Sequence, residues 1–185
     1  GETRAKVATN LLHDYGYFNG SVSYKEVPQK NPKEAKVSYV IDMDRPYFLD
    51  SIAYLKYPHY ADSLIQSTRS LSVLKSEENF SVIKLEEERQ RLSNLFRNHG
   101  YYYYRPEFTT YRADTLQKSG YVSLQVVPRN GIPAKAKKQY YIGNTSVYLT
   151  GYDNEPPTDT LRLRTMTFYY SGKKPGIRPN ALMRN

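Results

Sequence analysis

The chain has 185 residues, no cysteine, and a formal net charge of +9. Its length suits one ordinary domain or two small ones, and the lack of cysteine excludes disulfides and thiolate-bound zinc. The Lys and Arg residues are scattered along the chain, which argues against direct nucleic-acid binding, and no apolar run approaches the roughly 20 residues of a membrane-spanning helix.

The first segment predicts a helix followed by a two-stranded hairpin. Apolar residues recur at helical spacing between Thr3 and Tyr15, and Gly16 follows as a helix stop. Alternating residues then predict strands over Ser21–Val27 and Val37–Ile41, separated by a polar loop that contains two prolines.

The central segment, about 49–129, predicts the order strand, helix, helix, strand, strand. The long second helix begins after a Ser81 N-cap and carries one apolar stripe. The expected elements are a strand at Ile52–Tyr57, a helix at His59–Leu74, a helix between Ser81 and Gly100, and strands at Tyr101–Tyr111 and Tyr121–Pro128.

Two of the predicted helices end in the same way. Gly16 is followed by Tyr17-Phe18, and Gly100 is followed by Tyr101-Tyr102. Glycine adopts the left-handed conformation that ends many helices without a steric penalty, and aromatic residues suit a strand that follows. A helix end used twice indicates a repeated module.

The last segment predicts the beginning of a further module. Tyr140–Leu149 repeats the pattern of Tyr47–Leu55 and predicts a strand, residues 150–165 predict a loop, and Ile177–Leu182 predicts a helix entry. We therefore expect the C-terminal part of one module at 1–48, a complete module at 49–134, and the N-terminal part of another at 135–185. Because the chain starts with Gly1 instead of Met, we expect an excised piece of a longer protein.

The strand-helix-helix-strand-strand order in tandem resembles the polypeptide-transport-associated (POTRA) domain. The resemblance rests on the helix with Glu88-Arg89 and Arg91-Leu92, on Leu95–Tyr102 after it, and on the similar Leu12–Val22 segment. The chain is similar to the periplasmic arm of the BamA/TamA group of outer-membrane assembly factors, especially its TamA-like branch. This resemblance implies an α+β fold of tandem POTRA-like modules, each a three-stranded mixed sheet covered on one face by two helices.

The resemblance also implies a periplasmic scaffold that binds unfolded outer-membrane polypeptides and contacts accessory periplasmic proteins. We expect the parent protein to be attached to the bacterial outer membrane through a barrel that follows the arm. In that fold the strand after the second helix lies at an exposed sheet edge. Pro106 favours an edge independently, because proline cannot donate to a strand ladder.

Edge strands present unpaired N–H and C=O groups, so we expect an extended polypeptide to bind here by strand addition. The expected contact residues on this edge alternate along the predicted strand. They are Tyr101, Tyr103, Arg105, Glu107 and Thr109, with Ser21, Ser23 and Lys25 on the corresponding edge of the first module.

Two other interpretations are compatible with the sequence. One is an RNA-binding module that uses Tyr-rich strands and basic residues, and the other is a purely structural spacer. No phosphate loop, nucleophile elbow or paired-carboxylate motif is present, so we expect no enzyme, no metal and no cofactor. Asp42-Met43-Asp44 is interpreted as a turn, and His13, His59 and His99 lack the spacing of metal ligands.

Overall fold

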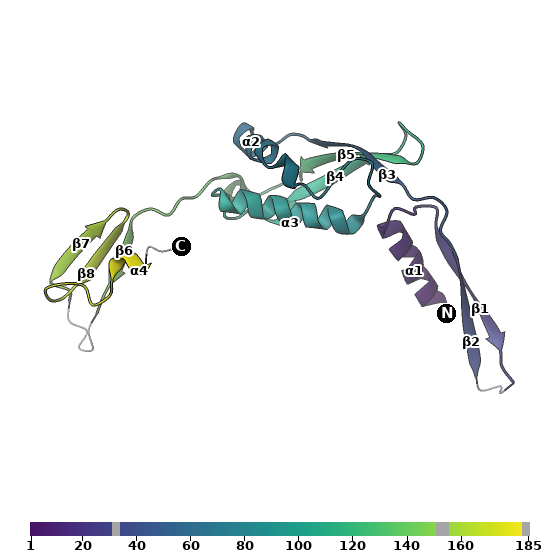
Figure 1. Ribbon diagram of the computed structural model, residues 1–185, viewed down its shortest axis with the longest axis horizontal. Coiled ribbons are helices and arrows are strands. Elements are labelled where there is room, and N and C mark those ends of the chain that lie inside the picture. Colours follow the sequence, from purple (N-terminus) through teal and green to yellow (C-terminus); the bar gives the residue numbers. More distant parts are fainter. Residues whose placement is uncertain (31–33, 151–155, 183–185) are drawn as a thin grey trace. The chain divides into compact units, whose positions relative to one another are not determined.

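The computed structural model describes residues 1–30, 34–150 and 156–182 (Figure 1). The chain forms two compact units, Gly1–Gln139 and Tyr140–Asn185. Within the described ranges, no helix is both long and apolar enough to cross a lipid bilayer.

The first unit begins with one helix and a hairpin, as the sequence predicts. Helix α1 spans Glu2–Asp14, and strands β1 (Ser21–Pro28) and β2 (Ala35–Asp42) pair antiparallel. The helix is fastened to β1 through its Thr9 hydroxyl, which accepts a hydrogen bond from the Val22 N–H at 3.0 Å.

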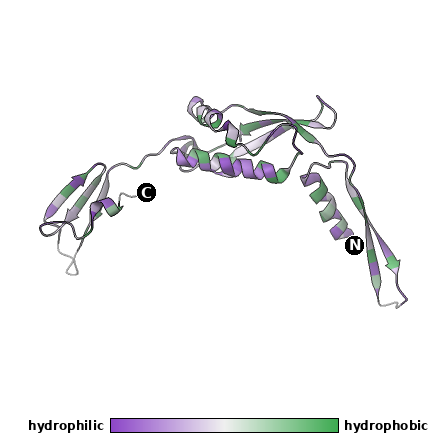
Figure 2. Ribbon diagram, in the orientation of Figure 1, coloured by the Kyte–Doolittle hydropathy of each residue, from purple (hydrophilic) through white to green (hydrophobic). Residues whose placement is uncertain are grey.

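This N-terminal part has little core of its own. Ala5 is the buried side chain of α1. Hydrophobic residues recur along α1 and along the hairpin (Figure 2), and several of them are largely exposed. Those with more than half of their surface exposed are Val7, Leu11, Val40 and Ile41.

The middle of the first unit contains the predicted strand-helix-helix-strand-strand module. Its elements are β3 (Phe48–Tyr54), α2 (His59–Ser67), α3 (Val82–Asn98), β4 (Thr109–Asp114) and β5 (Tyr121–Pro128), with short 3-10 turns η1 (Arg69–Leu71) and η2 (Pro106–Phe108). The strand order is β3-β5-β4, so β5 is central. It runs parallel to β3 and antiparallel to β4. The first helix is shorter than expected, because the chain leaves the α-helix after Ser67 and continues as η1.

Both helices cover the same face of this sheet. Alternate residues of β5, Val122, Leu124 and Val126, are at most 1% exposed and belong to one core with Ile65 of α2 and Phe96 of α3. Residues two apart on a strand share a face, so both helices lie on one side of the sheet. The predicted fold class is confirmed.

The repeated helix end is also confirmed. Gly16 and Gly100 have φ angles of 89° and 92°. Each glycine N–H donates to the carbonyl three residues earlier, at 3.0 and 3.2 Å. The N–H of the next residue, Tyr17 or Tyr101, donates to the carbonyl five residues earlier, at 3.0 Å in both cases. This is the Schellman arrangement, which requires the left-handed residue that glycine supplies.

Gly16 also allows the N-terminal part to approach the central module closely. Its carbonyl accepts a hydrogen bond from the Tyr47 N–H at 2.9 Å, and a Cβ at this position would lie 2.9 Å from the Phe80 carbonyl oxygen. The ring of Phe18 packs against the rings of Tyr47 and Phe80, each at a centroid distance of 5.0 Å. A side chain at Gly16 would disturb this junction.

The second unit differs from the predicted beginning of a module. It contains β6 (Thr145–Tyr148), β7 (Asp159–Leu163) and β8 (Met166–Tyr170) in the order β6-β8-β7, followed by α4 (Pro179–Leu182). As in the central module, the middle strand is parallel to the first and antiparallel to the second. No helix separates β6 from β7 among the described residues of this unit.

The prediction of a loop over 150–165 was wrong at β7, while 151–155 lie outside the described residues. Leu161 and Leu163 are half-buried and alternate with exposed Thr160 and Arg162. This two-residue period marks a strand, although the segment is polar on average. The helix entry predicted near Pro179 is confirmed.

Candidate polypeptide-binding edge

The segment between α3 and β4 forms a turn instead of the predicted strand. Tyr101 and Tyr104 are buried, the Tyr104 N–H donates to the Tyr101 carbonyl at 2.9 Å, and both rings pack on Phe96 at centroid distances of 5.8 and 4.7 Å. Tyr102 and Tyr103 are exposed. Burial at positions three apart belongs to a turn, so the prediction of a strand from Tyr101 was wrong.

The predicted contact residues are therefore divided between a turn and a strand. Arg105 and Glu107 flank Pro106, which begins η2, and form an exposed ion pair at 3.8 Å. Thr109 is the first residue of β4. Of the five residues predicted for this edge, Thr109 alone lies in the edge strand.

Strand β4 is an edge strand, as expected. One contact determines which of its residues direct their backbone groups toward β5 and which direct them outward. The Arg129 N–H donates to the Phe108 carbonyl at 2.7 Å, and these residues lie opposite each other in the continued β4–β5 register. Inward and outward backbone groups alternate along an antiparallel strand. Thr109, Tyr111 and Ala113 therefore direct their N–H and C=O groups outward, where no other described strand pairs with them.

The opposite edge of the same sheet is largely covered. Leu49 of β3 donates its N–H to Glu78 at 2.8 Å and accepts from the Glu77 N–H at 2.7 Å. The Arg69 guanidinium donates to the Ile52 carbonyl at 2.6 Å. These contacts occupy backbone groups that an added strand would need, so β4 offers the more accessible edge of this sheet.

The side chains of β4 hold it firmly against α3. Thr109 is 1% exposed, and its hydroxyl lies 3.0 Å from the Tyr104 hydroxyl. The Tyr111 hydroxyl donates to the Leu85 carbonyl at 2.6 Å, and the Arg89 guanidinium lies 5.1 Å from the Tyr111 ring. An edge held in place in this way loses little conformational entropy when it binds a partner.

The corresponding edge of the first module is β1. Val22 lies opposite Ile41 of β2, but its N–H bonds the Thr9 hydroxyl and therefore points away from β2. The alternation of an antiparallel pair then directs the backbone groups of its neighbours Ser21 and Ser23 toward β2. The same alternation places the Lys25 backbone in the ladder. The predicted residues Ser21, Ser23 and Lys25 lie in β1 with exposed side chains, while outward backbone groups come from the residues between them.

Sequence reasoning missed a buried charged network between α3 and β3. Glu88 of α3 is 0% exposed and accepts hydrogen bonds from the Tyr54 hydroxyl at 2.5 Å and from the Val73 N–H at 3.2 Å. Arg91 donates to both of its carboxylate oxygens, at 2.9 and 2.6 Å. Burial by itself would lower the pKa of Arg91, but the hydrogen bonds and charge of Glu88 raise it above its ordinary value.

This network joins α3 to β3 and to the segment between the helices. Glu88 lies three residues after Leu85 and four before Leu92, so the helical period places it on the buried face of α3. The residue type concealed this, because a glutamate is almost never fully buried unless it is paired. Elsewhere, no group of three or more His, Cys, Asp or Glu residues that could hold a metal ion occurs in the part of the chain that the structure describes.

Comparison with known proteins gives structural neighbours but no sequence relatives. No protein-family profile and no curated protein matches the chain. A crystal structure of Haemophilus influenzae BamA POTRA3-5 matches with a TM-score of 0.45 and 10% identity, covering 81% of this chain and 55% of that chain. The N-terminal domain of Omp85 from the cyanobacterium Thermosynechococcus elongatus matches with a TM-score of 0.32 and 17% identity, covering 88% and 59%.

A third neighbour is BamA from Haemophilus ducreyi lacking POTRA domains 1-3, with a TM-score of 0.40 and 13% identity over 68% of this chain and 22% of that one. The chain thus spans 22–59% of the length of these three structures. TM-scores of 0.32–0.45 at 10–17% sequence identity do not establish a family. The architecture described above stands on the strand order and packing of the chain itself.

Proposed function

We propose that the chain is a non-catalytic polypeptide-docking scaffold that binds extended polypeptides by strand addition to β4. The observation that carries the proposal is the outward backbone of Thr109, Tyr111 and Ala113 on a strand fixed to α3. Each hydrogen bond to an added strand contributes only about 0.5–1.5 kcal/mol net, so a few of them give weak binding that tolerates many sequences. Such binding suits an unfolded client that must later be released.

The wider setting is part of the same proposal. By its POTRA-like architecture the chain is a periplasmic arm, divided at 1–48, 49–134 and 135–185, of an outer-membrane assembly factor in the TamA-like branch of the BamA/TamA group. Its clients are unfolded outer-membrane polypeptides, with accessory periplasmic proteins as further partners. The edge of β1 beyond Val22, whose own N–H is taken by the Thr9 hydroxyl, is a second binding strand in this proposal.

The RNA-binding interpretation is less well supported by the positions of the aromatic rings. A module of that kind needs aromatic faces on an open sheet surface. Tyr101 and Tyr104 lie in the core instead, and Tyr111 faces α3 through its bond to Leu85. A purely structural spacer would not need an uncovered and rigid edge.

Strand addition can be tested with the substitution Ala113→Pro. Proline removes an outward N–H that takes no part in the β4–β5 ladder, so the fold should be retained. The loss of one hydrogen bond should weaken binding of a fluorescently labelled, unfolded outer-membrane polypeptide roughly two- to tenfold, measured by anisotropy.

Ala113→Val is the matched control, because it adds bulk at the same exposed position and keeps the N–H. It should bind the labelled polypeptide as the unchanged chain does, and both variants should unfold at similar urea concentrations. Equal binding by a folded Ala113→Pro variant would rule out capture along β4.

A further inference from the structure

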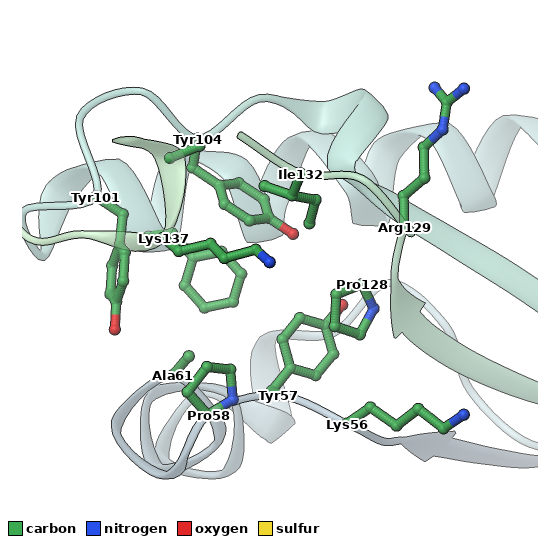
Figure 3. A pocket seen from close by; sticks show the side chains of 12 residues that line it. Lys56, Tyr57, Pro58, Ala61, Tyr101, Tyr104, Pro128, Arg129, Ile132 and Lys137 are labelled. Carbon is green, nitrogen blue, oxygen red and sulfur yellow. The ribbon is translucent and has the colours of Figure 1, made fainter. Parts of the chain in front are cut away.

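A small aromatic pocket lies in the first unit, outside the β4 edge. It encloses about 170 Å³ and is open to solvent on one side. Figure 3 shows side chains from the loop after β3, from α2, from the turn after α3, and from residues 128–137 converging on it. A cavity of about 150 Å³ holds one benzene-sized ring, so the pocket has room for a single aromatic group.

The walls of the pocket are aromatic. The Phe96 ring lies 5.8 Å from the ring of Tyr57, 5.8 Å from that of Tyr101 and 4.7 Å from that of Tyr104. A guest ring would meet both faces and edges of these rings, an arrangement that favours offset or edge-to-face contacts.

The pocket is closed on another side by η3 (Ala134–Lys137), the 3-10 turn that follows β5. Ile132 lies just before this turn and is 8% exposed, and Ala136 lies in the turn and is 1% exposed. Both residues line the pocket. Both side chains are apolar, so they add to the contact surface for a ring without requiring a hydrogen bond.

The charged side chains that line the pocket are those of Lys56, Arg129 and Lys137. The Lys137 side chain crosses the pocket in Figure 3, whereas Lys56 and Arg129 turn their charged ends away. In the described ranges, no ion pair joins Lys137 to a carboxylate.

We propose that this pocket binds an aromatic ring that carries a carboxylate. The ring lies among Tyr57, Phe96 and Tyr104, and the carboxylate pairs with the Lys137 ammonium. Lys137 is an exposed residue that lines the apolar recess, and its positive charge favours an aromatic acid over a neutral aromatic group. The site is separate from β4, so the proposal holds whether or not β4 captures a client.

The test compares N-acetyl-phenylalanine with its neutral amide by NMR titration of the whole chain. The acid should bind roughly threefold to fivefold more tightly than the amide, as expected for one partly exposed ion pair. Shifted amide signals should cluster at residues 56–61, 96–104 and 128–137.

Lys137→Gln should make the acid and the amide bind equally, whereas Lys138→Gln, a neighbouring exposed lysine outside the pocket, should preserve the difference. Ala61→Leu, which fills the recess from α2, should weaken both ligands. Equal binding of acid and amide to the unchanged chain, signal shifts located elsewhere, or no binding at all would overturn the proposal.

Discussion

Replacing Glu88 with alanine is expected to lower the free energy of unfolding of the central module by about 3–5 kcal/mol. The substitution removes the carboxylate to which Tyr54, Val73 and Arg91 all donate. The half-buried Arg91 guanidinium would then lack its counter-charge, and an unpaired buried charge costs much more than the intact pair contributes. Urea unfolding followed by circular dichroism measures the loss.

Glu87→Ala is the matched control, because Glu87 is the adjacent residue of α3 and is exposed. Its effect should stay within about 0.5 kcal/mol. Glu88→Gln keeps an acceptor oxygen but not the charge, so it should fall between the two. A loss below about 1 kcal/mol for Glu88→Ala would show that the network does not hold α3 on the sheet.

The central module should also lose stability in alkaline solution, between about pH 10 and pH 12. Burial, followed by the hydrogen bond to Glu88, raises the pKa of Tyr54 to about 12. Burial likewise raises the pKa values of Tyr57, Tyr104 and Tyr111. All four side chains belong to the core or pack against it.

The sign follows from the direction of these shifts. A folded-state pKa above the unfolded value of about 10 means that the folded chain holds the phenol proton more tightly. This contribution is complete below pH 10 and is lost as the pH rises through the folded-state pKa. For Tyr54 it amounts to at most about 2 kcal/mol after allowance for partial solvent access.

The free energy of unfolding, measured at pH 9, 10, 11 and 12, should therefore fall steadily above pH 10. Tyr54→Phe should give a shallower fall, because one of the shifted groups is gone. A stability that does not change up to pH 12 would mean that these phenols ionise as they do in the unfolded chain.

The sequence predicted the local elements well where two signals agreed. The apolar stripe and the Ser81 cap placed α3 correctly, and the Ser81 hydroxyl accepts a hydrogen bond from the Lys84 N–H at 3.4 Å. Gly100 correctly marked the end of α3. By contrast, β7 has a polar composition, and only its two-residue alternation indicates a strand.

The candidate site was predicted only in part. Pro106 indicated that the strand after α3 lies at an edge, and β4 does, but Pro106 begins η2 ahead of the strand instead of lying inside it. Four consecutive tyrosines fit a strand by composition, and nothing local shows that Tyr101 and Tyr104 turn together onto Phe96. Which backbone groups face outward depends on register, which needs the partner strand.

Amide hydrogen exchange tests strand addition at β4 most directly, because it reports on single backbone N–H groups. In the free chain, the outward amides of Thr109, Tyr111 and Ala113 should exchange faster than the ladder amides of Thr110 and Arg112. Adding an unfolded outer-membrane polypeptide should slow the three outward amides selectively. If they exchange at the same rate with and without bound polypeptide, while protection appears elsewhere on the chain, strand addition at β4 is contradicted.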